Sequence, residues 1–157
     1  MAELFDVRVV GSDKPLDRAA LLAALQDADI LVPTLTDTID APLLAGAGER
    51  LKLIANYGAG VDHIDVATAR QRGILVSNTP GVLTEDTADM GLALMLAVLR
   101  RMTEGMAKMQ DGVWEGWAPE ALLGTRLGGK SLGILGMGRI GQAMARRARA
   151  FGMNIHY

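Results

Sequence analysis

The chain has 157 residues, of which 50% are hydrophobic, with a formal net charge of −2 and no cysteine. This length allows one domain, or one and a fraction, with a sizeable apolar core. A nearly neutral chain has no basic field to concentrate nucleic acid or an anionic membrane, and the absence of cysteine excludes disulfides and thiolate chemistry. We therefore expect neither nucleic acid nor a membrane as a partner.

The amino terminus, Met1–Asp6, is acidic where an export signal would need a basic segment ahead of its apolar run. The longest apolar run, Met90–Leu99, is about half of the roughly 20 residues that a bilayer span requires. We interpret this run as a buried helix. Together these features predict a cytoplasmic protein.

Short apolar runs alternate with helical patterns in the first half of the chain, which is typical of βα units and a parallel sheet. We predict helices at 16–28, at 40–47 with Asp40 as N-cap and Pro42 in the first turn, and from Asp65 to Arg70 with Gly73 ending it. The predicted strands lie at residues 7–10, 30–32, 51–55 and 74–76.

The second half begins after Asn78–Gly81, which interrupts the pattern. Thr84 begins a long helix predicted to reach about Gln110, with acidic residues in its first turn, where the helix dipole favours them. Residues 111–129 contain five glycines and two tryptophans and are predicted to form an irregular linker.

An apolar strand over residues 131–135 leads directly into Gly136-Met137-Gly138-Arg139-Ile140-Gly141 and a predicted helix. This GxGxxG pattern between a strand and a helix indicates dinucleotide binding. The first glycine permits a tight turn, the second leaves room for a pyrophosphate, and the third lets the helix approach the sheet. Main-chain N–H groups at the helix start then face the phosphates. A purely structural glycine turn is the alternative.

A further strand is predicted at Met153–Tyr157. The residue that distinguishes a ribose 2′-hydroxyl from a 2′-phosphate is expected after this strand. NAD and NADP are therefore equal alternatives.

Several segments in this order resemble one family. They are Asn56–Asp65 (NYGAGVDHID), Gly73–Thr84 (GILVSNTPGVLT), Thr87–Asp89, Arg100–Arg101, Trp114 and Gly129–Gly133, which leads into the glycine pattern. Their order and spacing resemble the D-isomer-specific 2-hydroxyacid dehydrogenases of the glyoxylate and hydroxypyruvate reductase type.

The resemblance implies an α/β fold with two domains facing each other across a cleft. Residues 1–99 would form a flavodoxin-like parallel-sheet domain that binds substrate and lacks its C-terminal return. Residues 100–157 would supply a bridging helix, the linker and the first βαβ of a Rossmann domain for NAD or NADP. The intact protein would be a homodimeric oxidoreductase that transfers a hydride from NAD(P)H to a small 2-oxo acid, giving a D-2-hydroxy acid.

The same resemblance assigns site residues. Gly58, Ala59 and Gly60 match the loop whose N–H groups hold the substrate carboxylate. Thr87 matches a position on the nicotinamide side of the cleft. Gly138, Arg139 and Ile140 match the pyrophosphate contacts, and Gly136 and Gly141 complete the cofactor-binding turn. The family's catalytic arginine, glutamate and histidine are expected beyond residue 157, and neither His63 nor His156 matches that histidine. We therefore expect the 157-residue chain alone to be inactive and to bind cofactor weakly.

Other interpretations remain open. An NAD(H)-sensing, corepressor-like binding module is the main functional alternative, and an inactive scaffold or degradation remnant is another. The spacing in Asp62–Asp65 fits no familiar metal site, so we expect no metal. We interpret these residues instead as contributing a helix cap and local hydrogen bonds beside the Gly58–Gly60 loop. For the methionines at helical spacing we favour core or dimer packing over a partner-binding face. For the basic cluster, apart from Arg139 near the phosphates, we favour a solvated helix face over a nucleic-acid-binding helix. These sets are Met102, Met106 and Met109, and Arg139, Arg146, Arg147 and Arg149. Trp114 and Trp117 are assigned no role.

Overall fold

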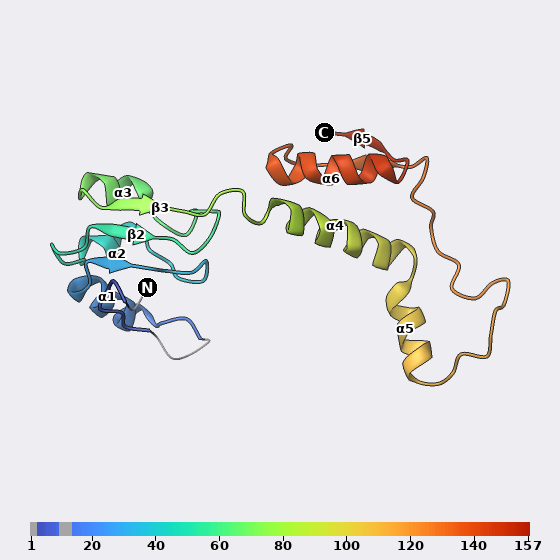
Figure 1. Cartoon of the computed structure of the whole chain (residues 1–157), viewed down its shortest axis with the longest axis horizontal. Helices are drawn as coiled ribbons and strands as arrows, with labels where there is room; N and C mark the ends of the chain where they lie inside the picture. Colours follow the sequence, from blue (N-terminus) through green and yellow to red (C-terminus); the bar gives the residue numbers. More distant parts are fainter. Residues whose placement is uncertain (1–2, 10–13) are drawn as a thin grey trace. The chain divides into compact units, whose positions relative to one another are not determined.

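The computed structural model describes residues 3–9 and 14–157. The chain divides into two compact units, Met1–Pro80 and Gly81–Tyr157 (Figure 1). Each unit has its own parallel sheet combined with helices. This is the α/β architecture that the alternating pattern predicts.

The first unit is built on a three-stranded parallel sheet with strand order β1-β2-β3. The strands are β1 (Ile30–Leu31), β2 (Leu53–Ala55) and β3 (Leu75–Ser77), and the helices are α1 (Arg18–Asp27), α2 (Ala41–Ala45) and α3 (Val66–Gln71). Consecutive strands are joined through a helix, as parallel neighbours require. The core includes Leu25, Leu44 and Ile54, none of which is exposed.

Aspartate side chains cap all three helices of this unit. Asp17 accepts a hydrogen bond from the N–H of Ala20, and Asp40 and Asp65 accept from Leu43 and Thr68, at 2.8 to 2.9 Å. Each of these bonds satisfies a main-chain donor that the first helical turn leaves without an intrahelical partner. The predicted caps at Asp40 and Asp65 are confirmed.

The predicted strand over residues 7–10 is not confirmed. Residues 7–9 have no regular structure and are exposed, and Val10 lies outside the described residues. A strand needs a neighbour to accept its main-chain hydrogen bonds. The recorded pairings join β1 to β2 and β2 to β3, and none includes residues 7–9.

The second unit contains α4 (Thr84–Leu99), α5 (Met102–Gln110), β4 (Ser131–Gly133), α6 (Arg139–Ala150) and β5 (Asn154–His156). Strands β4 and β5 pair in parallel, so the predicted strand after the glycine pattern is present. Residues 111–129 contain only turns and irregular segments, as predicted.

The single long helix predicted from Thr84 to Gln110 is wrong, because the chain breaks between α4 and α5. Arg101 takes the left-handed conformation with φ of 53°, which no α-helix can continue through. The Leu99 carbonyl at the end of α4 accepts a hydrogen bond of 2.6 Å from the N–H of Thr125. The returning linker therefore supplies a donor where the helix ends.

One face of α4 packs against α6, which presents alanines at its buried positions. An apolar cluster joins Leu127, Ala148 and Met153 to Leu96 and Leu99 of α4. Met90, Leu94 and Val98 on the other face are exposed. The interpretation of Met90–Leu99 as a buried helix is therefore correct for one face only, because this part of α4 is apolar on both faces. No helix within the described residues is long and apolar enough to cross a membrane.

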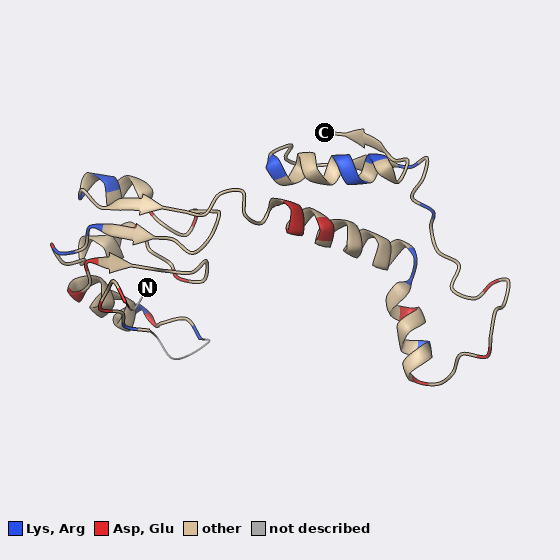
Figure 2. Ribbon diagram, in the orientation of Figure 1, with Lys and Arg blue, Asp and Glu red and all other residues tan. Residues whose placement is uncertain are grey.

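Charged side chains join the same two helices. Basic residues lie along α6 and acidic residues lie in the first turns of α4 (Figure 2). Glu85 pairs with Arg146 and Arg147 at 2.8 Å, and Asp89 pairs with Arg147 at 2.5 Å. Two members of the arginine cluster are thus ion-paired with α4. The prediction of a solvated face is wrong for Arg147, whose side chain is 20% exposed, whereas Arg146 is exposed as predicted.

These ion pairs predict a pH-dependent stability. The hydrogen bond from Arg147 lowers the pKa of Glu85 below its ordinary value. A lowered pKa in the folded state stabilises the fold above the ordinary pKa, and the contribution is lost as pH falls through the lowered value. Glu85→Gln should therefore lower the free energy of unfolding at pH 7, and the difference from wild type should vanish in strong acid.

Urea unfolding followed by tryptophan fluorescence tests this, because Trp114 and Trp117 both lie in the second unit. Glu120→Gln is the matched control, since Glu120 has no ion pair within the described part of the chain. If Glu85→Gln differed from wild type in its free energy of unfolding by as much in strong acid as at pH 7, the prediction would be contradicted.

The two compact units do not coincide with the predicted domain ranges 1–99 and 100–157. The first unit ends at Pro80, and α4 belongs with α6 in the second unit. The assignment of those ranges to substrate and cofactor stays a prediction.

Candidate functional site

The glycine turn between β4 and α6 has the local geometry that the three glycines predict. Gly136 has a φ of 97°, a conformation that favours glycine. A Cβ atom on Gly141 would lie 2.2 Å from the Gly136 carbonyl oxygen, so only glycine fits this close approach. A Cβ on Gly138 would meet nothing within 4 Å. The open space beside Gly138 fits a pyrophosphate approaching the main chain.

The amino terminus of α6 leaves main-chain donors available for an anion. Gly138 is the N-cap residue and offers no side-chain cap, and the first turn has no acidic residue. The first intrahelical bond is donated by Gln142 to the Gly138 carbonyl at 2.9 Å. The preceding N–H groups, including those of Arg139 and Ile140, therefore have no acceptor within the helix. With the positive end of the helix dipole, they suit a phosphate.

The second candidate element is the loop Gly58-Ala59-Gly60, which follows β2 in the first unit. Gly58 is buried, whereas Ala59 and Gly60 are exposed. The loop follows the carboxyl end of a parallel strand, where ligands bind in open α/β sheets.

Two asparagines hold the carbonyl groups of this loop. Asn56 follows β2 directly and donates from Nδ2 to the carbonyls of Gly58 and Gly60, at 3.1 and 2.8 Å. Asn78 follows β3 directly and donates from Nδ2 to the Ala59 carbonyl at 2.8 Å. Because neighbouring parallel strands end at the same edge of the sheet, both side chains reach one loop.

The hydrogen bonds from the two asparagines fix the orientation of the loop carbonyls, and the carbonyls determine the direction of the loop N–H groups. In a trans peptide the carbonyl and the following N–H point in opposite directions. The N–H groups of Ala59, Gly60 and Val61 therefore point away from the asparagines, and none has an acceptor among the described residues. Three successive free donors on an exposed turn can bind a carboxylate.

The remaining predicted residues lie in separate places. Thr87 is exposed in the first turns of α4, and its N–H donates to the Leu83 carbonyl at 3.0 Å. His63 bonds Asn56 through Nε2 at 3.0 Å, and Asp65 caps α3. His156 is exposed at the end of β5. The described residues contain no group of three or more histidine or acidic side chains arranged to hold a metal.

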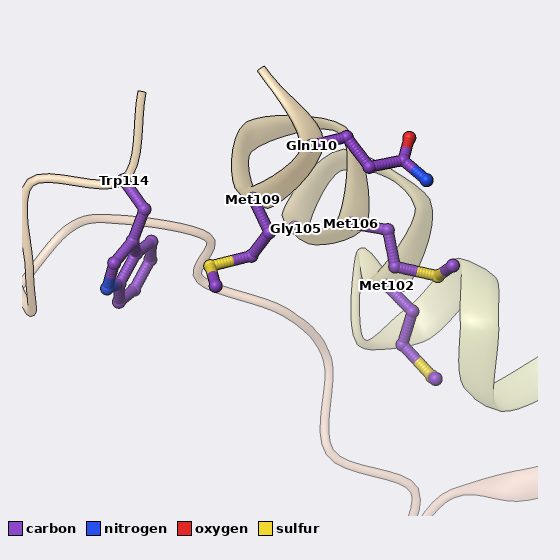
Figure 3. Close-up of a pocket in the computed structure, with 6 residues that line it drawn as sticks. All are labelled: Met102, Gly105, Met106, Met109, Gln110 and Trp114. Atoms are coloured by element: carbon purple, nitrogen blue, oxygen red, sulfur yellow. The ribbon is translucent and has the colours of Figure 1, made fainter. Parts of the chain in front are cut away.

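The methionines of α5 are not in the core. Met102, Met106 and Met109 are exposed and line a shallow apolar pocket with Trp114 (Figure 3). The core-packing half of the prediction is therefore wrong for these side chains. Dimer packing on this face stays a prediction.

The sequence matches one protein family over nearly its whole length. Residues 2–152 match the family described as D-isomer specific 2-hydroxyacid dehydrogenase, catalytic domain. The chain belongs to this family. The resemblance inferred from the motifs is confirmed.

Relatives within the D-2-hydroxyacid dehydrogenase family cover nearly the whole chain. A glyoxylate reductase of Thermococcus litoralis is 46% identical over 159 residues, which covers 99% of this chain and 48% of the relative. The crystal structure of TT0316 protein from Thermus thermophilus is similar with a TM-score of 0.84 and 55% identity, covering 90% of this chain and 45% of that one. The chain spans about half the length of the relatives it matches.

A more distant member of the family shows the ligands of one relative. D-lactate dehydrogenase from Aquifex aeolicus, solved with NAD and lactic acid, is similar with a TM-score of 0.75 and 29% identity. The match covers 85% of this chain and 39% of that one. That family member binds a nicotinamide cofactor together with a small 2-hydroxy acid.

Asn56 and Asn78 are the residues of this loop region that the sequence alone did not assign to a function. The sequence feature that could have identified them is their position, because each asparagine directly follows a strand of the parallel sheet. The bond between His63 and Asn56 agrees with the local hydrogen bonding expected of Asp62–Asp65, although its partner depends on how the loop folds back.

Proposed function

We propose that an enzyme containing this chain transfers a hydride between NAD(P)H and a small 2-oxo acid of the glyoxylate or hydroxypyruvate type. The observation that carries the proposal is the glycine turn, in which Gly141 meets the Gly136 carbonyl and Gly138 leaves open space. Membership in the 2-hydroxyacid dehydrogenase family supports the reaction class. The similarity to glyoxylate reductases supports the small substrate.

The finer fold assignment is part of the same proposal. The first unit would be the flavodoxin-like substrate domain, and β4, α6 and β5 would be the first βαβ of a Rossmann domain. The parallel pairing within each sheet supports both assignments. Residues 1–99 and 100–157 would then be the two functional ranges.

Within this proposal each element has a role. Main-chain N–H groups of Gly138, Arg139 and Ile140 would hold the cofactor pyrophosphate, with Gly136 and Gly141 shaping the turn. Those of the loop Gly58–Gly60 would hold the substrate carboxylate, and Thr87 would line the nicotinamide. The bound cofactor supplies the hydride. The family's histidine, expected beyond residue 157, would act as acid and base at the substrate oxygen. The glutamate would set the pKa of that histidine, and the arginine would bind the carboxylate and the carbonyl.

The test follows absorbance at 340 nm in an enzyme that contains this chain together with the second half that its relatives possess. We expect oxidation of NADH or NADPH with glyoxylate or hydroxypyruvate, and the preferred nucleotide identifies the cofactor. Tight nucleotide binding without turnover of either acid would favour the sensing module instead.

The 157-residue chain provides a second test. We expect no turnover and weak or no nucleotide affinity, because the chain has only part of the adenosine-binding half of a Rossmann domain. Isothermal titration with NADH and NADPH measures this directly. Submillimolar affinity for either nucleotide would contradict the expectation.

A further inference from the structure

Asn56 is the one polar side chain among the buried residues that the structure describes, with 2% of its surface exposed. A buried amide is costly unless its hydrogen-bonding groups are satisfied. Both ends of this amide have partners. Nδ2 donates to the carbonyls of Gly58 and Gly60, and Oδ1 lies 3.0 Å from Nε2 of His63.

These contacts fix the orientation of the amide and the role of the histidine. Carbonyl oxygens only accept hydrogen bonds, so the NH₂ end of Asn56 must face Gly58 and Gly60. The Oδ1 end then faces His63, and an oxygen there requires a donor. His63 must therefore carry its proton on Nε2, in a bond that holds the amide in this orientation.

Without the histidine donor, Oδ1 would be left buried without a partner. Rotation of the amide by half a turn would place Oδ1 against the carbonyls of Gly58 and Gly60, where two acceptors repel. Neither arrangement holds the two carbonyls as the present one does. The direction of the N–H groups of Ala59 and Val61 depends on those carbonyls.

We propose that Asn56 and His63 form a positioning pair that orients the Gly58–Gly60 loop and thereby sets its affinity for a carboxylate. The inference rests on the proposed function of this loop. Neither residue touches the substrate in this proposal, and His63 acts only through Asn56. The bond from His63 to Asn56 is the element that distinguishes this role from simple packing.

The test uses the ¹⁵N-labelled 157-residue chain titrated with glycolate, with sodium chloride at equal ionic strength as the reference. The readout is the change in amide chemical shift of Ala59, Gly60 and Val61 per unit of glycolate. His63→Phe keeps an aromatic ring but removes the donor, and His63→Ala removes both. His63→Gln returns a donor through its side-chain amide.

We expect both donor-free variants to reduce the glycolate response to about one-fifth, since one hydrogen bond to a buried group is lost. His63→Gln should restore it to within about twofold of wild type by the same bond. Asp17→Ala is the matched control, because it removes the α1 cap and weakens the same unit without contacting the loop. Its response should equal that of wild type.

An unchanged response in His63→Phe and His63→Ala would overturn the inference, and so would equal losses in His63→Gln and His63→Phe. A wild-type chain whose loop amides do not respond to glycolate would overturn the proposed role of the loop itself, and the inference with it. The two failures are distinguishable because only the second affects wild type.

Discussion

Gly141→Ala is expected to destabilise the second unit by about 2–4 kcal/mol, as insertion of an atom into a closed contact does. The new Cβ would lie 2.2 Å from the Gly136 carbonyl oxygen and 3.3 Å from Cγ2 of Ile134. The first neighbour is main chain, which cannot rotate aside. Helix propensity alone favours alanine over glycine by about 1 kcal/mol, so the sign of the effect separates the close approach from propensity.

Urea unfolding followed by tryptophan fluorescence measures the effect. Gly133→Ala is the matched control, because it lies in β4 of the same unit and its Cβ would meet nothing within 4 Å. We expect the control to match wild type within about 0.5 kcal/mol. A Gly141→Ala chain as stable as the control would show that α6 does not approach the turn as closely as described.

Gly141→Ala should weaken cofactor binding as well as the fold. To relieve the contact, the start of α6 must move away from the Gly136 turn, and the N–H groups proposed to hold the pyrophosphate move with it. In an enzyme containing this chain, the Michaelis constant for the nucleotide should rise together with the loss of stability.

Features that depend on neighbouring residues were predictable from the sequence. The caps at Asp40 and Asp65 follow from an aspartate placed at the start of an apolar helical pattern, and both are present. The turn at Gly136 follows from the strand, glycine and helix pattern, since each glycine has a steric reason that the spacing reveals.

Features created by distant segments were not predictable. The break at Arg101 coincides with the return of the linker, whose Thr125 N–H reaches the Leu99 carbonyl. No local signal near Arg101 indicates it, because the methionine spacing continues a helical pattern. The strand predicted at residues 7–10 is not seen at the described residues 7–9 for a related reason, since alternating valines indicate a strand only where a partner strand is available.

In the loop Gly58–Gly60, too, only the local feature was visible in the sequence. The glycines marked the loop as a candidate site, whereas the bonds from Asn56 and Asn78 that orient it arise because two strands end at one edge of the sheet. The order of strands in the sheet decides which side chains meet there. A single sequence does not state that order directly.

Gly48→Ala tests a close approach between Gly48 and the main chain of α1 that no sequence motif indicates. Its N–H donates to the Leu25 carbonyl at 3.1 Å, and an added Cβ would lie 2.3 Å from the Gln26 carbonyl oxygen. Gly48 is not among the glycines with positive φ, so backbone conformation gives no reason against alanine. The contact with the α1 main chain alone predicts a loss of about 2–3 kcal/mol in the first unit.

Two other glycines of the same unit complete a graded series. A Cβ on Gly46 would meet Cδ1 of Leu22 at 2.7 Å, and one on Gly60 would meet nothing closer than 3.5 Å. A flexible leucine side chain can move where a main-chain carbonyl cannot, so Gly46→Ala should cost less than Gly48→Ala. Gly60→Ala should be neutral or stabilising by up to about 1 kcal/mol, because alanine reduces the entropy of the unfolded chain. Amide hydrogen exchange in α1 and β2 measures all three, and equal losses at Gly46 and Gly48 would refute the distinction between side-chain and main-chain contacts.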